Sequence, residues 1–66
     1  MATAAALPAV PVGKIKSIGP IGPKYEVGPL LRPLVGGDWM VEISLIESGE
    51  KTEYRLSSVL DDPEGV

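Results

Sequence analysis

Residues 38–56 alternate between apolar and polar side chains, and no other feature of the sequence restricts the fold as strongly. A period of two places every second side chain on the same face of a β-strand. The two alternating runs flank Ser48-Gly49, a pair typical of tight turns. The sequence therefore predicts a β-hairpin with one apolar face, formed by Trp39, Val41, Ile43, Leu45, Thr52, Tyr54 and Leu56.

The register of this hairpin depends on the length of its loop. A two-residue loop at positions 48–49 pairs Glu47 with Glu50 and sets Glu42 opposite Arg55, a favourable cross-strand ion pair. The like charges of Glu47 and Glu50 count slightly against this register. A four-residue loop shifts the register and keeps the same side chains on each face. A slip of one residue would exchange the two faces, so we disfavour a three-residue loop without a bulge.

Six of the seven prolines lie in the first half of the chain, and they disfavour a helix across residues 17–33. We expect residues 1–23 to form an extended arm rich in Pro, Gly and Ala. Within it, residues 14–18 alternate weakly, as a short edge strand does. Residues 24–36 are predicted to be extended but interrupted, because Pro29 and Pro33 cannot donate hydrogen bonds to a neighbouring strand.

A single helical turn is predicted after the hairpin. Ser57 or Ser58 can cap its N-terminus, and Pro63 ends it. Val59 and Leu60 would then fold back onto the apolar face of the hairpin. The tail from residue 64 on is expected to fray.

These elements together predict a mainly β fold. Residues 24–66 form a small antiparallel meander of two or three strands with one short C-terminal helical turn, and residues 1–23 form an extended Pro/Gly-rich N-terminal arm. The first residues lack the positive charge of a signal peptide, and no apolar run is long enough to span a membrane. We therefore expect a soluble, cytoplasmic protein.

The chain is short and lacks the residues that most often carry chemistry. It has 66 residues and neither Cys nor His, which excludes disulfides, thiolate zinc sites and imidazole ligands. A chain of this size buries only roughly 60% of the surface that its unfolded form exposes. We therefore expect no enzyme and no cofactor, and a protein partner or a homo-oligomer that adds buried surface.

Several apolar side chains are candidates for the surface that meets this partner. Trp39 begins the central strand, and a Trp in so small a core is more often a core residue than an interface residue. Met40 and Ile46 fall on the otherwise polar face of the hairpin. The complete set of candidates is Trp39, Met40, Ile46, Ile15, Ile18, Ile21 and Tyr25.

An alternative function is contact with nucleic acid through the N-terminal half. Residues 1–36 carry a net charge of +3 and residues 37–66 a net charge of −6. The basic side chains that could meet phosphates are Lys14, Lys16, Lys24 and Arg32. The acidic hairpin would repel phosphates, so a protein partner is the first hypothesis.

Three segments of the sequence resemble a family of short proteobacterial proteins of unknown function. They are residues 21–28 (IGPKYEVG), residues 39–43 (WMVEI), and residues 53–57 (EYRLS) with residues 61–64 (DDPE). The resemblance covers about residues 18–65 and implies a bacterial source without an assigned activity. Short proteins of this kind often belong to mobile or defence-related gene sets, which include inhibitors and antitoxins. The resemblance assigns no functional residue.

Overall fold

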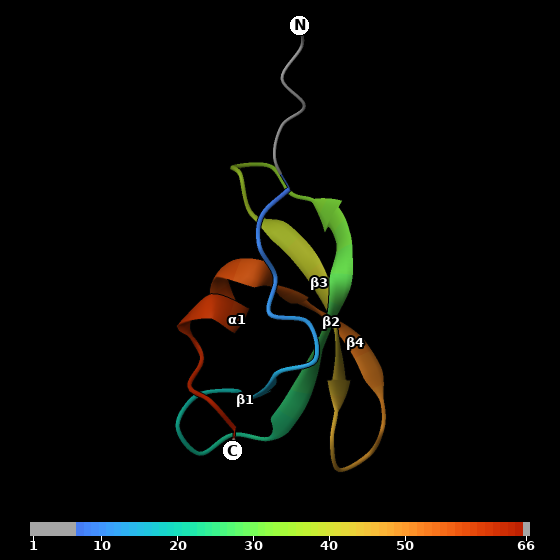
Figure 1. Cartoon of the computed structure of the whole chain (residues 1–66), viewed down its shortest axis with the longest axis vertical. Coiled ribbons are helices and arrows are strands. Elements are labelled where there is room, and N and C mark those ends of the chain that lie inside the picture. Colours follow the sequence, from blue (N-terminus) through green and yellow to red (C-terminus); the bar gives the residue numbers. More distant parts are fainter. Residues whose placement is uncertain (1–6, 66) are drawn as a thin grey trace, which may run out of the picture.

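The computed structural model describes residues 7–65 and shows a four-stranded antiparallel sheet with one short helix packed against it (Figure 1). The elements are β1 (Ile15–Ser17), β2 (Lys24–Pro33), β3 (Trp39–Leu45), β4 (Lys51–Arg55) and α1 (Leu56–Asp61). Each strand pairs with the next strand along the chain, so the order in the sheet is β1-β2-β3-β4. The predicted mainly β antiparallel meander is confirmed, but it has four strands where two or three were expected.

The hairpin of β3 and β4 has the predicted faces and the register of the longer loop. Ile43 lies opposite Thr52, and the backbone N–H of Leu45 donates to the carbonyl of Glu50 at 2.8 Å. Four residues therefore form the loop, among them Gly49 with a φ of +73°. The prediction of a two-residue loop was wrong, and the alternative of a four-residue loop is confirmed.

Strand β2 continues past its first proline because it bulges there. Its first half lies between β1 and β3, and its second half pairs with β3. The register shifts between Val27 and Leu30, so that Gly28 and Pro29 together form the irregularity. A Cβ on Gly28 would lie 2.7 Å from the backbone oxygen of Glu42. Glycine therefore permits the close approach of β3, and the bulge accommodates a proline that cannot donate.

The segment before β2 joins the sheet, so an extended arm over residues 1–23 is not confirmed. The short strand expected at residues 14–18 is confirmed as β1. Just before it, the N–H of Gly13 donates to the carbonyl of Val27 at 2.8 Å. Residues 1–6 of the expected arm lie outside the described residues.

The end of the chain pairs with the outer edge of β1. The N–H of Ser17 donates to the carbonyl of Pro63 at 3.0 Å, and the N–H of Gly65 donates to the carbonyl of Ile15 at 2.8 Å. Gly65 is buried, with backbone atoms of Lys16 only 2.9 Å from where a Cβ would lie. The prediction that the tail frays was wrong for residues 64 and 65, because the edge of β1 offers them backbone partners.

The core lies between the inner face of the sheet and α1. Leu56 and Val59 are three residues apart, so both point from α1 towards the sheet. Val59 is buried as predicted, whereas Leu60 is 57% exposed. The buried core residues are Tyr25, Val27, Val41, Ile43, Leu56 and Val59, and the partly buried residues around them are Val10, Leu30, Trp39, Leu45 and Tyr54.

Side chains from distant parts of the chain hold both ends of α1. At the N-terminus, Asp38 accepts the N–H of Ser57 at 3.2 Å and its hydroxyl at 2.6 Å. The hydroxyl bond is the main reason that the pKa of Asp38 lies below its ordinary value. At the other end, the ammonium of the buried Lys16 donates to the carbonyl of Val59. The predicted caps Ser57 and Ser58 were wrong, because Asp38 supplies the acceptor.

Candidate functional site

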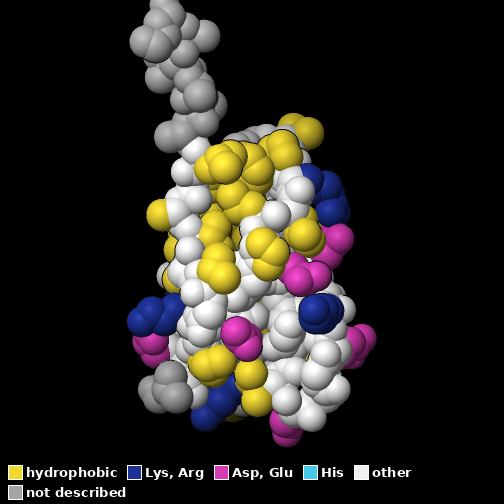
Figure 2. Space-filling model, turned by 45° about the vertical axis from the view of Figure 1, so that its right-hand side comes forward, with side chains coloured by type: hydrophobic (Ala, Val, Ile, Leu, Met, Phe, Trp, Pro, Cys, Tyr) yellow, Lys and Arg dark blue, Asp and Glu magenta, His cyan; other side chains and the backbone are white. Residues whose placement is uncertain are grey.

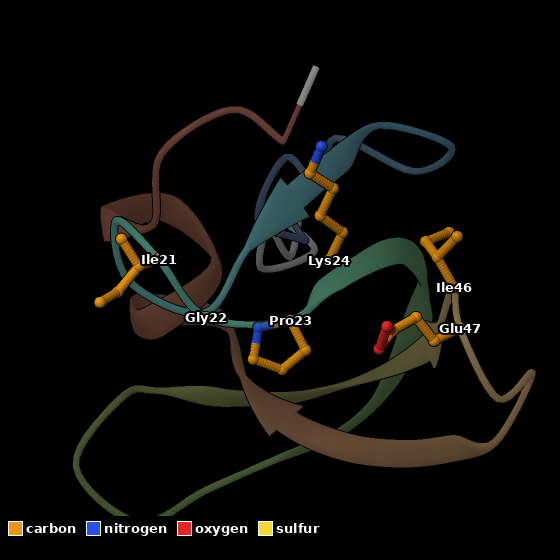
Figure 3. Close-up of a pocket in the computed structure, with 6 residues that line it drawn as sticks. All are labelled: Ile21, Gly22, Pro23, Lys24, Ile46 and Glu47. Carbon is orange, nitrogen blue, oxygen red and sulfur yellow. The ribbon is translucent and has the colours of Figure 1, made fainter.

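A shallow hollow lies on the surface where the loop before β2 meets the loop between β3 and β4 (Figure 3). Its volume is about 470 Å³. The residues that line it are Ile21, Gly22, Pro23, Lys24, Ile46 and Glu47. The hollow is therefore lined by both Ile21 and Ile46, two of the side chains that the sequence indicated as candidates for a partner surface.

Backbone contacts fix the walls of the hollow. The N–H of Ile46 donates to the carbonyl of Lys24 at 3.0 Å, which joins the β3–β4 loop to the first residue of β2. Within the first loop, the N–H of Ile18 donates to the carbonyl of Pro23 at 3.0 Å. A Cβ on Gly22 would lie 1.8 Å from the carbonyl oxygen of Ile18, so only glycine allows this tight loop.

The two isoleucines of the hollow are presented to solvent. Ile21 is 98% exposed and Ile46 is 50% exposed. In Figure 3 they lie at opposite ends of the hollow, and Pro23 lies between them. A branched aliphatic side chain on a rigid loop keeps its apolar surface in water and cannot turn into the core. Such a side chain is available to another molecule.

The hollow also carries one charge of each sign. Lys24 and Glu47 both line it, and in Figure 3 the carboxylate of Glu47 points towards Pro23. The ion pairs among residues 7–65 join Arg32 to Glu53 and Arg55 to Asp38, so neither Lys24 nor Glu47 takes part in one. The lining can therefore offer apolar contact, an ammonium group and a carboxylate.

The other candidates for a partner surface lie elsewhere. Tyr25 is fully buried, which places it in the core. Ile15, Trp39 and Met40 are half-buried, and Ile18 is 36% exposed without lining the hollow. Sequence reasoning missed Gly22, Pro23 and Glu47 as lining residues. The repeated Ile-Gly-Pro triplet at residues 18–23 is the sequence signal that could have indicated this loop.

The four basic residues of the nucleic-acid alternative do not form one surface. Lys14 and Lys24 are exposed, but Lys16 is buried under α1. Arg32 pairs with Glu53 at 2.6 Å. One of the four side chains is therefore withdrawn from solvent and another is already neutralised by a carboxylate.

A cluster of two tyrosines and one aspartate connects the core to the hollow. The hydroxyl of Tyr25 donates to Asp62 at 2.7 Å, and that of Tyr54 donates to the same oxygen at 3.1 Å. The tyrosine rings meet edge to face with centroids 5.5 Å apart. Burial is the main cause that raises the pKa of both tyrosines. The other oxygen of Asp62 accepts the N–H of Gly19 at 3.3 Å, which ties the loop of the hollow to this cluster.

Apolar side chains also gather at the opposite end of the molecule, on the upper part of the face shown in Figure 2. This is the end where β2 leads into β3 (Figure 1). Leu31 and Val35 are exposed there, while Leu30 and Trp39 also pack against the core. We therefore interpret this patch partly as the outer layer of the core.

Two further findings concern residues 7–65 alone. In this part of the chain no three His, Cys, Asp or Glu side chains come together in a way that could hold a metal ion. Likewise, the described residues contain no helix with the length and apolar character needed to cross a membrane.

Comparison with known proteins shows what the chain is similar to. Residues 3–65 match the model of a family of unknown function, DUF5397. An uncharacterized protein of Haemophilus influenzae is 49% identical over 55 residues, which cover 83% of this chain and 87% of that protein. These findings confirm the resemblance to short proteobacterial proteins of unknown function, and the chain belongs to the DUF5397 family.

Proposed function

We propose that this protein acts without catalysing a reaction, by binding another protein at the hollow between the loop before β2 and the β3–β4 loop. The observation that carries the proposal is that Ile21 and Ile46, from distant parts of the chain, line the same hollow. Both side chains remain exposed in the folded chain. Exposed apolar side chains grouped beside a concavity are typical of protein-binding surfaces.

The rigidity of the first loop supports this proposal. The loop is closed by the Ile18–Pro23 hydrogen bond and tied to Asp62 through Gly19. The backbone that carries Ile21 is therefore held in place before any partner arrives, and little backbone entropy is lost on binding. Burial of a fully exposed isoleucine side chain contributes about 1.5–3 kcal/mol. Ile21 alone would then supply a substantial part of the binding free energy.

The charges at the hollow define the chemistry of the partner. Lys24 would meet an acidic side chain and Glu47 would meet a basic one. The partner is thus an extended segment of a protein in which an aliphatic or aromatic side chain lies between an acidic and a basic residue. Opposite charges select such a segment and orient it. A protein with this binding mode would serve as an accessory subunit or as an inhibitor of its partner.

A random peptide library displayed on phage, selected against the purified full chain, tests the proposal. We expect the enriched peptides to share an apolar residue between an acidic and a basic one. Ile21→Ser and Ile46→Ser should each lower the affinity of the selected peptides by about tenfold or more, which corresponds to at least ~1.4 kcal/mol. Val35→Ser and Leu60→Ser are matched controls, because both side chains are exposed and neither lines the hollow.

The outcomes separate the proposal from its alternatives. Selected peptides that bind the Ile21→Ser variant as tightly as the wild type would show that the hollow is not the binding surface. Enrichment of no peptide sequence would equally contradict the proposal. Loss of binding in Val35→Ser instead would assign the function to the patch at the opposite end of the molecule.

A further inference from the structure

The edges of the sheet are protected unequally. The outer edge of β1 is covered by residues 63–65. The second half of β2 is also an edge, but it contains Pro29 and Pro33 and two shifts of register. Prolines and bulges of this kind prevent a further strand from pairing. Strand β4 contains neither a proline nor a bulge, and its register with β3 is uninterrupted. Nothing among residues 7–65 pairs with its other side.

The backbone of β4 offers a regular row of hydrogen-bonding groups on this free side. Since the N–H of Leu45 donates to the carbonyl of Glu50, alternation directs the polar groups of Thr52 towards β3. The N–H and carbonyl groups of Lys51 and Glu53 therefore point away from the sheet. A second strand can bond to these groups without disturbing the pairing of β3 and β4.

We propose that two copies of this chain pair through β4 in antiparallel orientation, about a twofold axis that passes beside Thr52. In this arrangement Lys51 of each copy lies opposite Glu53 of the other copy, and the two four-stranded sheets become one continuous sheet. Both residues have outward-pointing backbone groups, so these pairs are the hydrogen-bonded ones. Two oppositely charged pairs flank the axis, and such pairs stabilise adjacent strands.

The charges along β4, together with the start of α1 directly after Arg55, select this register over its neighbours. An axis beside Glu53 would set Lys51 opposite Arg55 twice, and an axis beside Lys51 would set two lysines opposite each other. An axis beside Tyr54 would set Glu53 opposite Arg55 twice, but it would place Leu56 and Ser57 of α1 opposite Thr52 and Lys51. The register centred on Thr52 is therefore the one in which charges attract and no residue of α1 lies opposite β4.

The surroundings of Glu53 favour an additional cation. Glu53 lies opposite Glu42 in the sheet, where the sequence had predicted that Arg55 would face Glu42. Arg32 reaches across β3 and donates to one oxygen of Glu53 at 2.6 Å. The side chain of Glu53 nevertheless remains 46% exposed. The ammonium of Lys51 from the second copy would bind the remaining oxygen and further offset the repulsion between the two glutamates.

The affinity of this pairing is expected to be low. One edge strand of five residues buries less than the roughly 800 Å² per partner of a standard interface. Sedimentation equilibrium of the full chain from about 10 µM to about 1 mM at low ionic strength therefore measures it. We expect the mean mass to rise from that of a monomer towards that of a dimer, and the rise to weaken at high salt.

Charge exchange tests the register directly. Lys51→Glu and Glu53→Lys should each weaken self-association by about tenfold or more, because two attractive pairs become repulsive. The double variant with both substitutions restores opposite charges across the axis and should dimerise again. Lys14→Glu and Asp61→Lys are the controls, since they alter exposed charges away from β4 and should leave the association unchanged.

Hydrogen exchange of the backbone amides is a second measurement of the pairing, and it requires no variant. The amides of Lys51 and Glu53 should exchange more slowly with solvent as the concentration of the wild-type protein rises. A monomer at all concentrations would overturn the proposal, and so would a dimer that the double variant fails to restore. A dimer lost in Ile21→Ser but retained in Lys51→Glu would also overturn it, and would assign self-association to the hollow.

Discussion

Among substitutions of partly exposed polar side chains, we expect Asp62→Ala to lower the free energy of unfolding the most. Asp62 accepts hydrogen bonds from Tyr25, Tyr54 and the backbone N–H of Gly19. It follows directly on α1 and joins the end of the helix to two strands and to the loop of the hollow. Alanine at this position would remove all three contacts together.

The magnitude follows from the burial of each donor. Tyr25 is 0% exposed, so its hydroxyl would lose its acceptor without gaining water, at a cost of about 1–3 kcal/mol. Tyr54 is half-buried, and water can replace part of its longer bond, so we assign about 0.5–1 kcal/mol to it. The bond from Gly19 at 3.3 Å is the weakest of the three. The total is about 2–4 kcal/mol, against roughly 3–10 kcal/mol expected for the whole chain.

Urea unfolding followed through the fluorescence of Trp39 measures this loss. Asp61→Ala is the matched control, because it removes the same charge from an exposed neighbour whose side chain accepts no hydrogen bond within residues 7–65. The control should change the free energy of unfolding by less than about 0.5 kcal/mol. If Asp62→Ala were no more destabilising than Asp61→Ala, the role assigned to this carboxylate would be refuted. The losses in free energy of unfolding caused by Tyr25→Phe and by Asp62→Ala should not add in the double variant, because both substitutions break the same hydrogen bond.

Three further predictions concern other contacts. The pKa values of Tyr25 and Tyr54 are raised in the folded chain, so their stabilising contribution should be complete below the unfolded tyrosine pKa of about 10 and be lost as the pH rises above it. Urea titrations at increasing pH should show this loss, and Tyr25→Phe should reduce it. Gly28→Ala should cost about 1–3 kcal/mol, since its Cβ would lie 2.7 Å from the oxygen of Glu42; an unchanged urea midpoint would contradict the close approach of the strands. Asp38→Ala should speed the exchange of the Ser57 amide with solvent, and equal exchange in both proteins would show that Asp38 does not cap α1.

The features that could be predicted best are those that depend on residues close together in the sequence. The inner and outer faces of β3 and β4 were predicted correctly, because parity does not change when a loop grows from two residues to four. The register of the hairpin was not predicted correctly, because it depends on the number of residues in the loop. There the hydroxyl of Ser48 accepts the N–H of Glu50, and Gly49 adopts a positive φ. Both residues were visible in the sequence, but neither fixes the number of loop residues alone.

Features that depend on contacts between distant residues could not be predicted. Lys16 was assigned to a basic surface, but it is buried because its ammonium reaches a carbonyl at the end of α1. Asp38 is separated by 19 positions from Ser57, so no neighbouring residue indicates their contact. The hollow was missed as a site for the same reason. Ile21 and Ile46 were each recognised as apolar candidates for a partner surface, but only the pairing of β2 with β3 places both beside one hollow.

Polar side chains connect α1 and its flanking residues to segments that lie far apart in the sequence. Lys16, Asp38 and Asp62 each join α1 or its flanking residues to a segment at least 19 positions away. Each of these bonds forms only when the chain folds, and its free energy must offset the entropy lost when a long loop of chain is closed. The bond from Gly19 to Asp62 extends this set of contacts to the loop that presents Ile21. The exposed isoleucine therefore owes its fixed position to the same contacts that stabilise the core, so that folding and the formation of the proposed binding surface are one event.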